Sequence, residues 1–175
     1  MIQLRIEKAK KEDIKDIARV YVDGWKTTYQ GLVTDDYLES LSYEEAERKW
    51  FDLLNSENQT FIYIAINDAG KVIGFAAGQN SDDKNFAGEL YSLYLLKESR
   101  GLGAGRQLVS AIAKEFKEKG IESMMVWVMK KNKSGLGFYE RMGGEEYLRR
   151  KNAFGGMTVD DVAYGWRDIS ILFIE

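Results

Sequence analysis

The sequence Arg100-Gly101-Leu102-Gly103-Ala104-Gly105-Arg106 decides the fold prediction, because it stands between an apolar strand and an amphipathic helix. Residues 89–95 are mainly apolar, which is typical of a buried strand. From 108 to 116 the apolar residues recur at spacings of three and four, which predicts a helix that ends near Gly120. Glycines in such a turn let backbone N–H groups approach a ligand, and the start of the helix adds free donors. The pattern predicts a phosphate-binding loop, although a tight turn without a ligand also explains the glycines.

Two arginines, Arg100 and Arg106, flank the loop and favour the binding interpretation, since a turn needs no cations. The loop is not a P-loop, because its last glycine is not followed by Lys-Ser or Lys-Thr. It also departs from the dinucleotide fingerprint, because the third glycine comes one residue early and the next strand ends in Lys130-Lys131 rather than in an acidic residue. A basic strand end suits a 2′-phosphate, so an NADP-dependent reductase stays an alternative.

Outward from this loop, helices and strands alternate without a linker, a repeat or a proline. Strands are expected at about 2–8, 60–67, 71–79, 89–95, 123–129, 145–149 and 162–169. Helices are expected at about 12–25, at 34–55 with a break near Ser42, from the glycine loop to 119, and at 134–141. This order predicts a single α/β domain over residues 1–175, with a mixed, mainly antiparallel sheet flanked by helices.

The composition excludes several kinds of chemistry. The chain has 175 residues, 25 Lys and Arg, 28 Asp and Glu, and neither Cys nor His. The sequence therefore offers no thiol nucleophile, no Ser-His-Asp triad and no histidine base, and we expect no metal site. A net charge of −3 argues against nucleic-acid binding. No apolar run is long enough for a membrane span or a signal peptide, so we expect a cytoplasmic protein without a membrane partner.

Two sequence motifs resemble those of the GNAT family of N-acetyltransferases. The central motif of that family, Arg/Gln-x-x-Gly-x-Gly/Ala, is matched by the glycine loop. A second pattern, an Asn before a short helix with Phe-Tyr and then a Gly, is matched by Asn132, Phe138-Tyr139 and Gly143. The resemblance covers about residues 2–169 and is specific between 89 and 144. Two departures are the absence of proline before the loop and Gly144 in place of the aromatic residue that is common after the final glycine.

The resemblance implies acetyl-CoA as the acetyl donor and assigns it a site. The loop amides would bind the pyrophosphate, and the backbone of the preceding strand would pair with the pantetheine arm. This pairing requires the fourth strand and the fifth strand, at 123–129, to splay apart. The cofactor residues so implied are Leu93, Tyr94, Leu95, Arg100, Gly101, Leu102, Gly103, Ala104, Gly105, Arg106, Asn132, Tyr139 and Arg141. Asn132 suits a helix N-cap equally well.

The resemblance also assigns Tyr139 as the acid that protonates the departing thiolate, and a phenol is protonated at neutral pH. The other interpretation is a buried tyrosine that anchors its helix. Glu89 is the candidate base for the amine, because burial among apolar neighbours would raise its pKa toward neutrality. A strand-start carboxylate in solvent is the alternative. Without cysteine, we expect direct transfer of the acetyl group to the acceptor amine.

For the acceptor, the segment 25–31 is unusually aromatic for a loop. Trp25 and Tyr29 could wall a pocket for a cationic amine, or they could cap the core. Tyr164 and Trp166 share one face of the last strand and would join the pocket or a homodimer interface. The expected acceptor is a small-molecule or peptide amine. The rival function is a non-catalytic sensor that binds coenzyme A or a nucleotide on the same fold.

Overall fold

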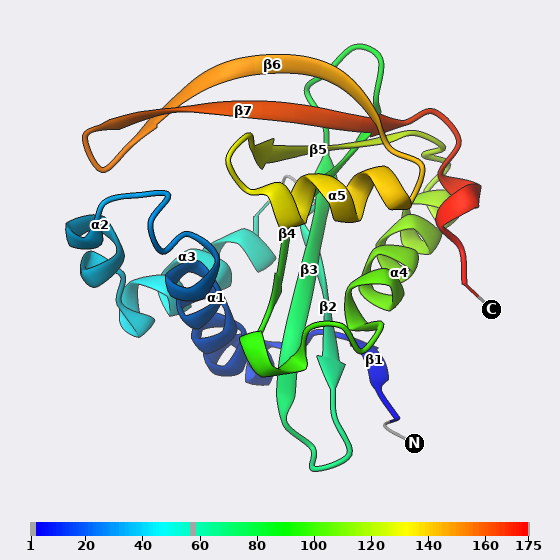
Figure 1. The fold of residues 1–175 in the computed structure, drawn as a ribbon. Helices are drawn as coiled ribbons and strands as arrows, with labels where there is room; N and C mark the ends of the chain where they lie inside the picture. Colours follow the sequence, from blue (N-terminus) through cyan, green and yellow to red (C-terminus); the bar gives the residue numbers. More distant parts are fainter. Residues whose placement is uncertain (1–2, 57–58, 175) are drawn as a thin grey trace.

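The computed structural model describes residues 3–56 and 59–174, and within them the chain forms one twisted sheet in the order β1-β2-β3-β4-β5-β7-β6 (Figure 1). Neighbouring strands are antiparallel except β4 and β5, which are parallel. The mixed, mainly antiparallel sheet is confirmed. The strands are β1 Arg5–Lys8, β2 Phe61–Ile66, β3 Val72–Asn80, β4 Gly88–Leu95, β5 Met124–Met129, β6 Glu145–Phe154 and β7 Met157–Trp166.

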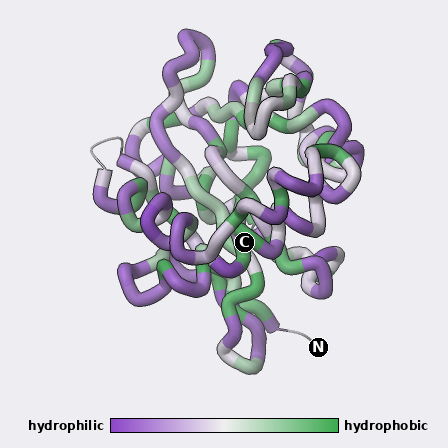
Figure 2. Tube along the Cα trace, turned by 90° about the vertical axis from the view of Figure 1, so that its left-hand side faces the viewer, coloured by the Kyte–Doolittle hydropathy of each residue, from purple (hydrophilic) through white to green (hydrophobic). Residues whose placement is uncertain are grey.

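Helices cover both faces of the sheet. Side chains of α1 and α3 pack on β2 and β3 around the fully buried Trp50. Those of α4 and α5 pack on the opposite face around Leu108, Ile112 and Phe116. The helices are α1 Ile14–Thr28, α2 Asp35–Ser40, α3 Tyr43–Leu54, α4 Ala104–Glu118 and α5 Lys133–Arg141, with short 3-10 turns at Lys11–Asp13, Lys97–Ser99 and Ile169–Leu172. Figure 2 shows apolar residues along the central strands and hydrophilic residues on the outer loops.

Local side-chain chemistry explains several boundaries. The Thr34 hydroxyl accepts a hydrogen bond from Tyr37 N at 3.3 Å and begins α2, and the Ser42 hydroxyl accepts one from Glu45 N at 3.1 Å and begins α3. The expected break near Ser42 is therefore confirmed. None of the helices in the described ranges is long and apolar enough to cross a membrane.

The feature that forms the site is the separation of β4 from β5. The two strands pair at Gly88↔Met124 and Glu89↔Met125, while β4 stays paired with β3 as far as Leu95. A β-bulge lies just beyond these pairs, because Tyr91 is an extra residue on β4 between the positions that face Gly78 and Ala77. A bulge bends its strand and increases the local twist. The expected splay between the fourth and fifth strands is confirmed, and the bulge lies at the point where they part.

Several expected boundaries are wrong. The last strands, expected at 145–149 and 162–169, form a long hairpin, β6 Glu145–Phe154 and β7 Met157–Trp166, around Gly155-Gly156, whose φ angles are 57° and 77°. The turn of this hairpin lies beside α2 (Figure 1), where Met157 Sδ accepts a hydrogen bond from Thr34 N at 3.3 Å. The first helix, expected to end near Trp25, continues to Thr28, so most of the aromatic segment is helical. Ile2 of the expected first strand lies outside the described residues.

Candidate functional site

A groove of about 500 Å³ lies between β4 and β5 where the strands separate. Five parts of the chain line it: the end of α1, β4, the glycine loop, β5 and α5 with the turn before it. Most of the residues predicted for the cofactor are brought together there. The lining residues are Thr27, Thr28, Tyr29, Tyr91, Ser92, Leu93, Tyr94, Leu95, Arg100, Gly101, Gly103, Gly105, Arg106, Val126, Trp127, Val128, Asn132, Ser134, Gly135, Phe138, Tyr139 and Arg141. Five predicted residues are not among them: Trp25, Glu89, Leu102, Ala104 and Tyr164.

The glycine loop forms a cradle of backbone at one end of the groove. Gly101 and Gly103 have φ angles of 79° and 85°, which residues other than glycine rarely adopt, and Gly103 is the N-cap of α4. A Cβ at Gly101 would meet no atom within 4 Å, and one at Gly103 would meet only the tip of Gln107 at 3.9 Å. The loop therefore leaves space beside the first N–H groups of α4, which lack intrahelical partners. This geometry fits a bound phosphate group.

Three arginines line the groove. Arg100 Nη2 donates to the hydroxyls of Thr28 at 2.7 Å and Thr27 at 3.2 Å, and so links the loop to the end of α1. Arg106 from α4 and Arg141 from α5 also line the groove. Guanidinium groups beside helix N–H donors suit a pyrophosphate, because hydrogen bonds between charged groups are the stronger ones. We assign Arg100 first to positioning α1 against the loop.

The edge of β4 that faces the groove has free backbone groups. Leu96 N donates to Ile73 O at 2.9 Å, so the N–H of Leu96 points to β3. Because this direction alternates along an antiparallel strand, Tyr94 also points its N–H to β3, while Leu93 and Leu95 point theirs to the groove. These two N–H groups are suited to pair with an extended amide chain. The side chain of Tyr94 packs against α1 instead, with its ring 5.3 Å from that of Tyr21.

Tyr139 lies in the groove wall on α5 and is buried. Burial raises the pKa of its phenol well above the usual value, and the neighbouring Tyr29 raises it further. The group therefore stays protonated at neutral pH and can donate a proton. Its ring meets that of Trp166 edge-on at 5.9 Å. A Cβ at Gly144 would lie 2.8 Å from the Trp166 ring, so Trp166 fills the space next to this glycine.

Tyr29 at the end of α1 connects the two sides of the groove. Burial, with a smaller contribution from the charge of Asp161, raises the pKa of its phenol to about 12, although hydrogen bonds with Asn132 and Tyr94 act in the opposite direction. The Asn132 side chain also accepts a hydrogen bond from Gly135 N at 3.1 Å, which confirms its N-cap role. The ring of Trp25 packs on that of Tyr29 with centroids 4.3 Å apart and the planes tilted by 38°. Tyr29 thus lines the groove, and Trp25 packs against it outside the groove lining.

Glu89 lies at the closed end of the fork, in the last pair that joins β4 to β5. It is outside the groove lining. Burial raises the pKa of its carboxyl group, while a hydrogen bond with Gln79 and the charge of Arg150 limit the rise. A carboxylate with a raised pKa is a better base near neutral pH than an exposed one.

The position of Tyr164 differs from the expectation. Its side chain is buried on the face of β7 that packs against α4 and α5, and its hydroxyl donates to Glu140 Oε1 at 2.6 Å. The alternation along β7 places Trp166 on the same face. The structure therefore places Tyr164 in the core, away from both the groove and the surface.

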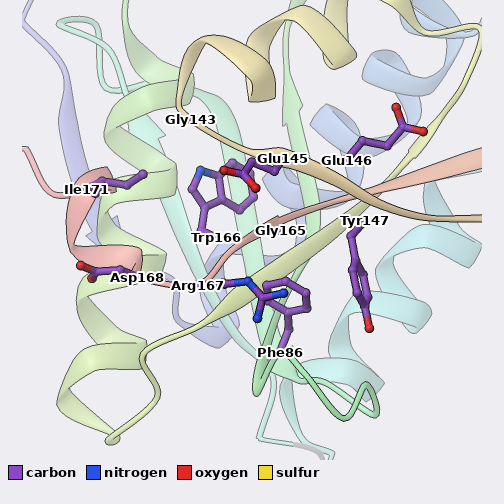
Figure 3. A pocket seen from close by; sticks show the side chains of 10 residues that line it. All are labelled: Phe86, Gly143, Glu145, Glu146, Tyr147, Gly165, Trp166, Arg167, Asp168 and Ile171. Carbon is purple, nitrogen blue, oxygen red and sulfur yellow. The ribbon is translucent and has the colours of Figure 1, made fainter.

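A second, smaller pocket of about 250 Å³ lies at the other end of β7 (Figure 3). Its side chains come from the loop before β4, the start of β6 and the residues around Trp166. Of the residues considered for the site, only Trp166 belongs to it, whereas most of the predicted cofactor residues line the groove. The groove is therefore the candidate site.

Sequence reasoning missed several groove residues. Thr27 and Thr28 lie between Trp25 and Tyr29 in the aromatic segment. Their hydroxyls accept hydrogen bonds from Arg100, a contact that the sequence alone does not indicate. Trp127 stands in the apolar run of β5, where sequence periodicity cannot distinguish a core residue from one that lines a groove.

Comparisons with known proteins agree with this geometry. Residues 17–144 match the model of the acetyltransferase (GNAT) family. An uncharacterized N-acetyltransferase of Bacillus subtilis, YuaI, is 39% identical over 169 residues, with 95% of each chain covered. A spermidine N(1)-acetyltransferase of Thermoplasma acidophilum is 28% identical, with 81% of this chain and 88% of that one covered. The PaiA N-acetyltransferase of the same organism, solved in complex with coenzyme A, superposes with a TM-score of 0.72 at 25% identity, covering 93% of this chain and 98% of that one.

Alanine substitutions at the two ends of α4 test the cradle. Gly103→Ala and Gly120→Ala place a side chain at φ angles of 85° and 80°, and neither Cβ meets a close neighbour. Each variant is expected to lose about 1–2 kcal/mol of stability in urea unfolding. Only Gly103→Ala is expected to weaken acetyl-CoA binding in calorimetry, by about tenfold or more, because its Cβ enters the space over the loop amides. Equal affinities in the two variants would make Gly103 a structural turn only.

Proposed function

The chain belongs to the GNAT family of acetyltransferases, and we propose that it transfers the acetyl group of acetyl-CoA directly to the amine of a small-molecule or peptide acceptor. The observation that supports this most is the combination of an open β4 edge with the glycine cradle at the end of the same strand. The first suits the amide-bearing arm of coenzyme A, and the second suits its pyrophosphate. Acetyl-CoA supplies the acetyl group as an activated thioester.

The groove residues divide the binding of the donor between them. The N–H groups of Leu93 and Leu95 would hold the arm along β4. The amides at the start of α4, with Arg106 and Arg141, would hold the pyrophosphate. Asn132 caps α5 through its oxygen at 3.1 Å from Gly135 N, and its hydrogen bond with Tyr29 links the start of α5 to the end of α1 across the groove.

Two protons must move for the transfer to balance. The amine nitrogen attacks the thioester carbon, the carbon–sulfur bond breaks, and the amine loses a proton while the sulfur gains one. Tyr139 would donate the second proton, since burial keeps its phenol neutral. Glu89 would receive the first through water, since it lies outside the groove lining. With no cysteine in the chain, no cysteine acyl intermediate can form.

The acceptor would approach from the side of the sheet that carries α1. Tyr29, Tyr91 and Trp127 line the groove with aromatic rings, which suit the alkyl part of an amine and its positive charge. The name of the Thermoplasma relative, a spermidine acetyltransferase, supports an amine as the acceptor class. Thiol release from acetyl-CoA across a panel of polyamines, amino acids and peptides tests the function. Acetyl-CoA binding without release for any amine would favour the sensor.

Replacement of Tyr139 by Phe removes the hydroxyl and keeps the ring that packs on Trp166. Turnover is expected to fall by about 10²- to 10⁴-fold, the usual contribution of a general acid, with acetyl-CoA affinity nearly intact. Steady-state kinetics and calorimetry measure the two quantities. Tyr147→Phe is the matched control, because that hydroxyl bonds Asn85 at the second pocket. Unchanged turnover in Tyr139→Phe would assign the residue to packing.

The pH profile of turnover tests Glu89. The base acts in its ionised form, so turnover should rise as pH increases through its raised pKa, which gives the pH profile an ascending limb. Glu89→Gln keeps a similar side-chain size and should remove this limb. The acceptor amine also deprotonates as pH increases, so two acceptors with different amine pKa values are compared. A limb that stays in place belongs to the enzyme. If the limb follows the acceptor in both wild type and Glu89→Gln at similar rates, solvent is the proton acceptor.

A further inference from the structure

A polar cluster lies next to the groove on the face of the sheet that is opposite α4 and α5. Arg150 of β6 places its guanidinium carbon 4.0 Å from the ring of Trp127, which lines the groove. Apolar clusters lie on both sides along this face, one around Met125 and one around Met129. The guanidinium therefore occupies a polar gap in an otherwise apolar surface.

The β6–β7 hairpin fixes the direction of this guanidinium. Arg150 and Asp161 are cross-strand partners, and Arg150 Nε donates to Asp161 Oδ2 at 3.1 Å. Asn152 Nδ2 donates to the same oxygen at 3.2 Å. The Asp161 side chain is 8% exposed and that of Arg150 is 43% exposed. Within residues 3–56 and 59–174, Asp161 is the one side-chain hydrogen-bond partner of the Arg150 guanidinium, and it engages Nε alone. The two Nη groups are left for a ligand.

The charges of this cluster act on Tyr29 in the groove wall and on Glu89, the proposed proton acceptor. The charge of Asp161 raises the pKa of Tyr29 in the groove wall. The charge of Arg150 lowers the pKa of Glu89 at the closed end of the fork. Arg150 therefore lies near the proposed proton acceptor as well as on the ring of Trp127. The guanidinium thus borders the groove through the ring of Trp127.

We propose that Arg150 binds a carboxylate on the acceptor, and that the acceptor class is free α-amino acids. This inference rests on the proposed acetyl transfer. The two Nη groups form a planar pair of donors that matches the two oxygens of a carboxylate. In an α-amino acid the carboxylate and the amine are joined through one carbon, so binding of the first on Arg150 orients the second. Asp161 is a positioning residue, because it acts through Arg150.

The same arrangement disfavours a polyamine. A second ammonium group of the acceptor would face the guanidinium at short range, and like charges in a partly buried site repel strongly. The aromatic walls accept a cation at the reacting end only. The cluster therefore discriminates between acceptors that carry an anion beside the amine and those that carry a second cation.

Paired acceptors test the proposal. Thiol release is measured for the L-amino acids, for their matched amides and for spermidine, with acetyl-CoA saturating. Wild type is expected to acetylate at least one amino acid with a kcat/KM about 10- to 100-fold above that of its amide, as for a charge-assisted hydrogen-bond pair. Arg150→Gln should remove this preference by raising KM for the acid, with the amide unchanged. Arg150→Lys should recover part of it, since it keeps the charge without the fork.

Arg149→Gln is the matched control, because Arg149 is the exposed neighbour on β6 and its Nε bonds Glu146 at 2.7 Å. The preference for the acid should survive this change. Acetyl-CoA thermal shifts verify that every variant is folded and binds the donor. Acetylation of amides or spermidine as readily as of the acids, or a preference that survives Arg150→Gln, overturns the role of Arg150 and leaves acetyl transfer standing. No thiol release with any of these amines overturns the amino-acid proposal, and no release with the peptides of the wider panel as well overturns acetyl transfer.

Discussion

The parting of β4 from β5 after two residue pairs is the constraint on which the rest of the site depends. Unpaired strand edges are normally avoided, because their N–H and C=O groups lose hydrogen bonds and invite association. Here the edge is exposed at the bottom of a groove rather than on the outside of the sheet. The extra residue Tyr91 bends β4 at the required point. The opposite neighbour of that bulge is Gly78, where a Cβ would lie 2.6 Å from Phe61.

Packing around the fork keeps it open. The ring of Phe138 on α5 packs against Gly105 at the start of α4, so closely that a Cβ on this glycine would lie 3.1 Å from the ring. This contact holds α5 against the start of α4. Trp166 supports the other side of α5 beneath Tyr139. At the end of α1, Arg100 ties the glycine loop to Thr28, and Tyr29 follows directly in the groove wall. The glycine loop, α5 and the end of α1 are thus joined around the groove, and a fixed arrangement of this kind would favour precise placement of the reacting groups.

Local features of the site were predictable, and contacts across strands were not. The strand, glycine turn and helix from 89 to 119 follow from periodicity and from glycine conformations, and the caps at Thr34 and Ser42 follow from side-chain chemistry. The hairpin of β6 and β7 was predicted too short, because charged residues between 149 and 161 hide its alternation. Alternation could place Tyr164 on one face of its strand, but it could not say that this face packs under α5. The pairing of Arg150 with Asp161 could not be predicted, because it depends on the register of that hairpin.

The central claim, that β4 receives the donor as an added strand, is tested most directly by amide hydrogen exchange followed by NMR with and without acetyl-CoA. The N–H groups of Leu93 and Leu95 point to the groove, and that of Tyr94 between them points to β3. Addition of acetyl-CoA should slow exchange at Leu93, at Leu95 and at the first amides of α4, with Tyr94 nearly unchanged. Exchange at Leu93 and Leu95 that does not respond to saturating acetyl-CoA would contradict the account.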